Sequence, residues 1–264
     1  MILIGEKLNS TIPSVRNALL SRDETAVAAL ATAQEGAGAD YLDINTALCS
    51  DGELDAMRWV LDTVQRSTSC GIMLDSPDPD VLAAAAQMLD GRNMILNSIT
   101  LGSASDRVLD AARELGAGVV CLPVSPDGGI PEDSRARAEN ACRLAQRCAA
   151  HGIAPEKLYI DVLVEAVSSG KHARTALDTV RAIRSELPGV HTICGLSNVS
   201  FGLPRRAAVN CAFLAAAMAA GLDSAILDVT SKRLRETLAA ARALLGEDEY
   251  CMDYIHFCRQ EEDR

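Results

Sequence analysis

Short apolar runs alternate along this chain with longer, alanine-rich segments in which apolar positions recur three and four residues apart. The short runs are typical of buried strands, and the longer segments are typical of helices that cover a sheet. The pattern predicts strands at residues 2–7, 41–45, 71–75, 94–99, 118–124, 158–163, 191–196 and 224–229. Helices are expected near residues 14–20, 24–35, 54–66, 79–89, 104–115, 133–150, 172–186, 206–220 and 231–245.

This order of strands and helices predicts the fold class. Eight β-then-α units in 264 residues favour a closed (β/α)8 TIM barrel, which needs roughly 250 residues, over an open doubly wound sheet. The chain is 48% hydrophobic but only 3% aromatic, which suits an aliphatic core of buried parallel strands. We expect a single-domain barrel in residues 1–246 and an acidic extension in residues 247–264 that packs on the barrel or trails from it.

A polar side chain ends nearly every apolar run. These residues are Glu6, Lys7, Asp43, Asn45, Asp75, Asn97, Asp161, Asn198 and Asp228. In a (β/α)8 barrel the carboxyl ends of the strands meet at one mouth, where active sites lie. We therefore expect these side chains around one mouth. Arg205 and Arg206 begin a helix after Pro204 and could be surface charge. That position faces the same mouth, however, so one of them could hold an anionic substrate tail or set the loop that carries Asn198.

Carboxylates and amides dominate this set, with no Ser-His-Asp combination. A carboxylate can accept two parallel N–H bonds from an amino-pyrimidinone edge, and an amide can both donate and accept. Asp75, Asn97 and Asp161 could together satisfy such a neutral heterocycle. Each residue also has a purely structural interpretation: Asp43 and Asp228 could cap helices or bond turns, with Asp78 the better cap near Asp75, and Glu6 and Lys7 could form an ion pair.

Charge and cysteine content narrow the function classes. A net charge of -11 argues against nucleic-acid binding, which needs clustered Lys and Arg. No apolar run is long enough to cross a membrane, and no signal-peptide pattern is visible. Nine cysteines without a Cys-x-x-Cys suit free thiols in a reducing compartment, so we expect a cytoplasmic protein. The four histidines lack zinc-ligand spacing, and no intrinsic metal is expected.

Several motifs together resemble one known family. They are Ile4-Gly-Glu-Lys-Leu-Asn9, Leu42-Asp-Ile-Asn45, Leu74-Asp-Ser76, Leu96-Asn-Ser98, Tyr159-Ile-Asp161 and Gly195-Leu-Ser-Asn-Val-Ser-Phe-Gly-Leu-Pro204. In order and spacing, from residue 1 to about residue 250, the chain resembles the pterin-binding methyltransferases that work with corrinoid proteins. These are the methyltetrahydrofolate:corrinoid protein methyltransferases and the folate-binding domain of cobalamin-dependent methionine synthase. The last motif is the most specific one.

The resemblance implies that tetrahydrofolate or methyltetrahydrofolate binds at the mouth as substrate. Asp75, Asn97 and Asp161 are implied to hold the pterin ring, with Asn198 beside N5, the nitrogen that carries the methyl group. Glu6, Asp43, Asn45 and Arg206 match secondary positions in the mouth, and Asp228 is grouped with them from its place after the eighth strand. Dihydropteroate synthase shares the barrel and the pterin, but its phosphate-binding loop pattern and buried lysine are not visible, so it is the weaker relative.

The implied reaction is methyl transfer between N5 and the cobalt of a cobalamin cofactor held by a separate corrinoid protein, because the corrinoid-binding pattern Asp-x-His-x-x-Gly is absent here. The chain would then be the second methyltransferase of a multi-component system, usually a homodimer. Two alternatives stay open. One is a corrinoid-linked methyltransferase acting directly on a methylated amine or ether, and the other is a catalytically silent folate-binding barrel.

Overall fold

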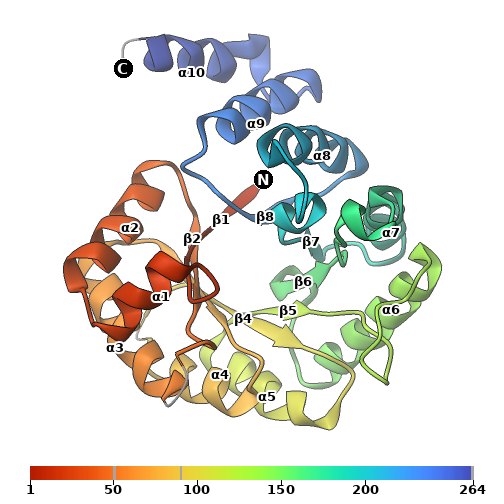
Figure 1. Ribbon diagram of the computed structural model, residues 1–264. Helices are drawn as coiled ribbons and strands as arrows, with labels where there is room; N and C mark the ends of the chain where they lie inside the picture. Colours follow the sequence, from red (N-terminus) through yellow and green to blue (C-terminus); the bar gives the residue numbers. More distant parts are fainter. Residues whose placement is uncertain (50–51, 90, 263–264) are drawn as a thin grey trace.

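The predicted strands all form, and they lie side by side in one parallel sheet (Figure 1). The computed structural model describes residues 1–49, 52–89 and 91–262. Its strands are β1 (Ile2–Asn9), β2 (Tyr41–Asn45), β3 (Gly71–Asp75), β4 (Met94–Ile99), β5 (Gly118–Cys121), β6 (Leu158–Asp161), β7 (His191–Ile193) and β8 (Ser224–Leu227). Their order in the sheet is β7-β6-β5-β4-β3-β2-β1-β8, so β1 pairs with both β2 and β8.

The sheet closes on itself between β7 and β8. Gly195, just beyond β7, forms a parallel bridge with Ile226, and the Ile226 N–H donates to the Cys194 carbonyl at 2.9 Å. This closure confirms the (β/α)8 barrel and rules out the open doubly wound sheet.

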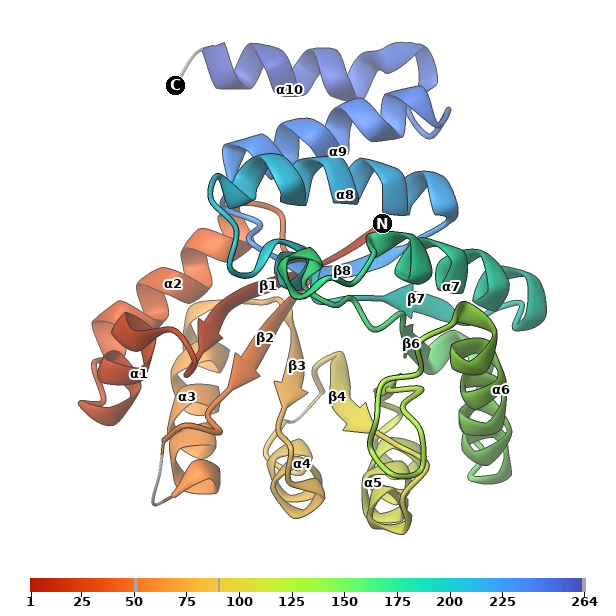
Figure 2. The same ribbon diagram turned by 45° about the vertical axis from the view of Figure 1, so that its right-hand side comes forward.

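Helices follow the strands and surround them (Figures 1 and 2). They are α1 (Pro13–Leu20), α2 (Glu24–Gly36), α3 (Glu53–Ser67), α4 (Pro79–Ala86), α5 (Asp106–Leu115), α6 (Ser134–Ala150), α7 (Ala173–Glu186), α8 (Arg206–Ala220) and α9 (Lys232–Leu244). Asp23, Asp78 and Asp133 cap α2, α4 and α6 by accepting backbone N–H bonds. The prediction that Asp78 is a helix cap is therefore confirmed.

Several strands end at other residues than the apolar pattern predicts. β5 stops at Cys121 instead of residue 124, because Pro123 has no N–H to continue a ladder. β6 stops at Asp161, whose carboxylate accepts the Leu163 N–H at 2.7 Å while Leu163 adopts a left-handed conformation with φ 56°. β7 stops at Ile193 because the chain enters a short 3-10 helix, η4 (Leu196–Ser200).

Two layers of apolar side chains hold the barrel together, because successive strand residues point to opposite faces. Outward residues such as Leu42, Ile44 and Leu74 pack under the helices. The inward residues form a separate cluster inside the barrel, made of Ile4, Met73, Ile95, Val120, Tyr159 and Ile193. The barrel is thus filled below the mouth, and only the next inward residue on each strand can reach a ligand.

The chain continues after α9 into a short 3-10 turn, η5 (Glu249–Cys251), and α10 (Met252–Glu262). α10 lies along α9 on the side away from the strands (Figure 2). The Arg235 guanidinium lies 5.8 Å from the centre of the Phe257 ring, and the Asp248 carboxylate accepts the backbone N–H groups of Asp253 and Tyr254. The extension is therefore a helix packed on α9; its last two residues, 263–264, lie outside the described part.

Candidate functional site

The alternation of strand residues brings the predicted site residues to one end of the barrel. Most of them lie two positions beyond an inward core residue; the pairs are Ile4 and Glu6, Met73 and Asp75, Ile95 and Asn97, Tyr159 and Asp161, and Ile226 and Asp228. Residues two apart in a strand share a face. Their side chains therefore face the barrel axis at the carboxyl ends of β1, β3, β4 and β6 and just beyond β8, which is the position of active sites in barrels of this kind.

Three of these polar groups stand side by side on neighbouring strands. Asn45 is paired with Asp75 in the β2–β3 ladder, and Asp75 with Asn97 in the β3–β4 ladder. The Asn45 Nδ2 donates to Asp75 Oδ2 at 2.9 Å, and the Asn45 Oδ1 accepts from the hydroxyl of Ser10 at 3.0 Å. Ser10 thus orients the Asn45 amide, and Asn45 in turn orients the Asp75 carboxylate. Burial raises the pKa of Asp75 above its ordinary value.

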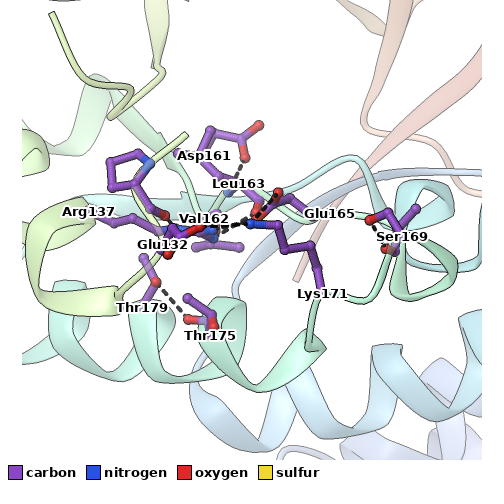
Figure 3. A network of polar contacts seen from close by, with 12 residues as sticks. Glu132, Arg137, Asp161, Val162, Leu163, Glu165, Ser169, Lys171, Thr175 and Thr179 are labelled. Atoms are coloured by element: carbon purple, nitrogen blue, oxygen red, sulfur yellow. Dashed lines mark hydrogen bonds and ion pairs between the residues drawn. The ribbon is translucent and has the colours of Figure 1, made fainter. Parts of the chain in front are cut away.

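Asp161 is fixed by a network of polar contacts that includes Arg137 and Glu165 (Figure 3). Its Oδ1 accepts the Leu163 N–H, and the carbonyls of Val162 and Leu163 accept bonds from Arg137 of α6 at 2.9 and 2.7 Å. Arg137 also donates to Glu165 Oε2 at 2.9 Å. Burial raises the pKa of Asp161 to about 6, against the opposing effects of the Leu163 N–H and the Arg137 charge. Arg137 therefore holds the backbone that orients this carboxylate.

A cluster of acids lines the β1–β2 side of the mouth. Asp43 is 2% exposed, and its Oδ1 has no hydrogen-bond partner among the described residues. Burial, followed by the negative charges of Asp75 and Glu6, raises the pKa of Asp43 well above its ordinary value. Burial likewise raises the pKa of Glu6, although a hydrogen bond from Ser197 opposes it. These carboxyls can hold a proton at a higher pH than exposed carboxyls can.

Asn198 lies on η4, above the end of β7, and its side chain is exposed. The backbone around it is tied down on two sides: the Ser197 hydroxyl donates to both oxygens of Glu6 at 3.0 and 2.9 Å, and Arg206 donates to the Ser197 carbonyl at 2.7 Å. The amide itself rests against Gly195, where an added Cβ would come within 3.0 Å of Nδ2. Gly195 therefore leaves the space that this amide occupies.

The remaining predicted residues have structural partners. Lys7 pairs with Asp228 at 2.8 Å, not with its neighbour Glu6. Burial alone would raise the pKa of Asp228, but the bonds from Lys7 and Thr230 hold it below its ordinary value. Arg206 donates to η4 through Ser200 Oγ as well, at 3.0 Å, so of its two predicted roles the structure shows the loop-setting one.

Sequence reasoning missed Arg137. This residue is 1% exposed, although it lies on a helix with many exposed charges. A signal was present, because Arg137 lies four and seven positions before the buried residues Ala141 and Leu144 of α6. A charged residue on an apolar helix face must find buried partners. Ser197, which bonds Glu6 from η4, could not be found in this way, because nothing in the sequence around it indicates a distant partner.

Comparisons with known proteins agree with this geometry. The profile of the pterin-binding enzyme family matches residues 5–228. The chain is 32% identical to a methylcorrinoid:tetrahydrofolate methyltransferase of Eubacterium limosum, over 98% of this chain and 97% of that protein. It is 30% identical to a methionine synthase of Mycobacterium tuberculosis over 86% of this chain, but this covers only 20% of the much longer synthase.

Solved structures show the same fold at lower identity. A Yersinia pestis DHPS, solved with a pterin–sulfa conjugate, superposes with a TM-score of 0.68 at 20% identity, covering 93% of this chain and 94% of that one. A Coxiella burnetii dihydropteroate synthase in complex with pteroic acid gives 0.65 at 17% identity, covering 92% and 94%.

The fold and the polar mouth define a pterin-binding barrel, and the chain belongs to the pterin-binding enzyme family. The family resemblance drawn from the motifs is confirmed. In the described part of the chain, no group of three or more His, Cys, Asp or Glu side chains is placed to hold a metal ion. No helix among the described residues is both long and apolar enough to span a bilayer.

Proposed function

We propose that this protein transfers a methyl group between N5 of tetrahydrofolate and the cobalt of a corrinoid carried by a separate protein. The observation that carries the proposal is the Asn198 loop: an exposed amide at the mouth of a pterin-binding barrel, next to Ser197, which is bonded to both Glu6 and Arg206. The near full-length similarity to a methylcorrinoid:tetrahydrofolate methyltransferase supports it.

The pterin ring would bind through its pyrimidinone edge. Asp75 and Asp161 accept N–H bonds from the ring, and Asn97 donates to its carbonyl and accepts from a ring N–H. Each carboxylate is oriented by a fixed donor, Asn45 Nδ2 for Asp75 and the Leu163 N–H for Asp161. Because these groups are held before the ligand arrives, binding costs little additional ordering.

Methyl transfer to N5 needs a side chain that can hydrogen-bond this nitrogen both when it carries a proton and when it does not. In tetrahydrofolate, N5 carries a proton and attacks the methyl carbon, so positive charge develops on N5 and the proton must leave. Asn198 accepts the N5–H through its carbonyl, and in the reverse direction donates to the N5 lone pair. The proton passes to a carboxylate on the acid side of the mouth, Asp43 or Glu6, whose raised pKa suits it to take up and return a proton.

A partner protein must reach the mouth for this chemistry. Three loops at the carboxyl end of the barrel expose large apolar side chains: Leu48 is 46% exposed, Ile130 is 44% and Phe201 is 68%. Exposed apolar groups around a functional opening favour contact with another protein. They support a separate corrinoid protein as partner, and with it the role of second methyltransferase in a multi-component system.

We also propose that the protein is cytoplasmic and forms a homodimer. The oligomeric state can be tested by sedimentation at several protein concentrations.

The test is an anaerobic spectrophotometric assay with methylcobalamin and tetrahydrofolate, following loss of methylcobalamin and gain of cob(I)alamin, run with and without a candidate corrinoid protein. Asn198→Ala should cost roughly 2–4 kcal/mol of transition-state stabilisation, a magnitude similar to the loss of one preorganised hydrogen-bonding group, with little change in pterin affinity. Asn93→Ala is the matched control, because Asn93 is exposed just before β4, at the opposite end of the barrel.

The outcomes separate the alternatives. Equal loss of turnover and affinity in Asn198→Ala would refute the assigned role. Tetrahydrofolate binding without transfer, even with the corrinoid protein, would identify a folate-binding barrel. Methyl transfer from a methylated amine without folate would identify a direct corrinoid-linked methyltransferase.

A further inference from the structure

A cavity of about 540 Å³ lies beside the mouth, where the loop after β6 leads into α7. Its walls are Val167, Gly170, Lys171, His172, Ala173 and Arg174. Three of these six residues carry basic side chains, in a protein whose net charge is -11. Basic groups gathered in a hollow of an acidic protein attract anions locally, because nearby charges determine the local potential more than the overall charge does.

The positive charge in this cavity is only partly neutralised. Lys171 is 3.4 Å from Glu132 and 3.9 Å from Glu165, separations at which an exposed ion pair is weak. His172 and Arg174 are exposed, and neither side chain has a hydrogen bond or an ion pair with another described residue. A guanidinium presents paired N–H donors that match a carboxylate. The cavity therefore offers donors and charge for an anion.

The loop that forms the cavity is connected to the pterin side of the mouth through Arg137. Arg137 binds the carbonyls just after Asp161 and also the Glu165 carboxylate, which approaches Lys171 (Figure 3). One buried side chain thus binds both the backbone next to the carboxylate that faces the ring and the acid that approaches the basic wall of the cavity.

The same loop also touches the loop of Asn198. It contains the short 3-10 turn η3 (Val167–Ser169), where the Ser168 hydroxyl donates to the Phe201 carbonyl at 2.6 Å. The loop that forms the cavity therefore contacts the site at two places: near Asp161 through Arg137, and at the Asn198 loop through Ser168.

We propose that this cavity is the subsite for the glutamyl tail of the folate substrate, with Lys171 and Arg174 binding its carboxylates; the assignment rests on the proposed function. When Asp75, Asn97 and Asp161 hold the pyrimidinone edge, the opposite end of the pterin, which carries the p-aminobenzoyl-glutamate, points out of the barrel. The tail is anionic, and each added glutamate brings a further carboxylate. The protein should therefore bind polyglutamylated folates more tightly than the monoglutamate.

The test compares three ligands by titration calorimetry: tetrahydrofolate monoglutamate, tetrahydrofolate triglutamate, and 6-methyltetrahydropterin, which has no tail. In Lys171→Gln/Arg174→Gln, the affinity for the triglutamate should fall about tenfold, as for two partly exposed charge contacts, while the affinity for 6-methyltetrahydropterin stays unchanged. The preference for triglutamate in the unsubstituted protein should shrink as salt is raised. Arg181→Gln is the control, because Arg181 lies exposed on α7 and pairs with Asp178 at 2.7 Å.

Other results would overturn the assignment. Equal weakening of all three ligands would show that the substitutions disturb the pterin site, and unchanged affinity for the triglutamate would show that the tail binds elsewhere. Unchanged folate affinities together with a slower reaction at low corrinoid-protein concentration would make the basic cavity a protein-docking site. Failure of the unsubstituted protein to bind any of the three ligands would instead refute the proposed function.

Discussion

Replacing Asp161 by asparagine separates what this residue does for the fold from what it does for the ligand. The amide oxygen can still accept the Leu163 N–H, which Asp161 Oδ1 now accepts at 2.7 Å, so the turn after β6 is preserved. The substitution removes a buried negative charge. We expect the free protein to become more stable and the pterin to bind less tightly.

The magnitude follows from the raised pKa. Burial raises the pKa of Asp161 from its ordinary value of 3.8 to about 6, so between these values the folded state binds a proton that the unfolded state releases. The carboxylate therefore costs nothing below about pH 4, and its cost grows as pH rises through 6. A change of one pKa unit is worth about 1.4 kcal/mol, which gives up to about 3 kcal/mol at pH 7.5.

The assay is urea denaturation of both proteins at pH 4.5, 6 and 7.5, with tetrahydrofolate titrated calorimetrically at pH 7.5. The free energy of unfolding of Asp161→Asn, relative to the unsubstituted protein, should increase with pH and level off above about pH 7. Tetrahydrofolate affinity should fall, because an amide cannot accept two parallel N–H bonds as a carboxylate does. A stability difference that is independent of pH would refute the burial argument, and unchanged folate affinity would refute the binding role.

Two further substitutions test the groups that position the site. Gly195→Ala would place a Cβ about 3.0 Å from Asn198 Nδ2, so kcat should fall up to about a hundredfold with pterin affinity unchanged. Gly36→Ala is the control, because a Cβ there meets nothing within 4 Å. An unaffected kcat in Gly195→Ala would show that the Asn198 amide has room to move. Arg137→Met should lower the free energy of unfolding by about 3 kcal/mol and weaken folate binding, because it leaves the Glu165 carboxylate and three backbone carbonyls without their buried partner. Arg137→Lys should restore part of both stability and folate affinity; a Met variant as stable as the unsubstituted protein in urea would contradict this role.

The strands and their polar ends could be predicted because both depend on local pattern. Period-two alternation and the apolar runs identify the strands, and the residue after each run is then forced to the carboxyl end. Asp75, Asn97 and Asp161 follow from this logic alone. The helix cap at Asp78 was equally accessible, since it depends on a short segment of sequence.

The details that tune the site depend on contacts far apart in sequence. The register of β1 shifts between Gly5 and Leu8, because Gln34 of α2 occupies the space over Gly5 and accepts the Lys7 N–H at 2.9 Å. The bond between Ser197 and Glu6 joins residues 191 positions apart. No local pattern specifies such pairs, and they determine which carboxylates are paired and which are left to titrate.

The two sides of the mouth therefore have different proposed functions, ligand binding on one and proton transfer on the other. On the β3, β4 and β6 side, donors from the protein hold Asp75 and Asp161 in place, as a binding surface requires. On the β1–β2 side, one oxygen of Asp43 has no hydrogen-bond partner among the described residues and the pKa of Asp43 is raised, as proton transfer requires. Ser197 connects this acid side to the loop of Asn198 through Glu6. Because an ionised carboxylate accepts a hydrogen bond more strongly than a protonated one, we expect protonation of Glu6 to weaken its bond from Ser197 and, through it, the hold on the loop that carries Asn198.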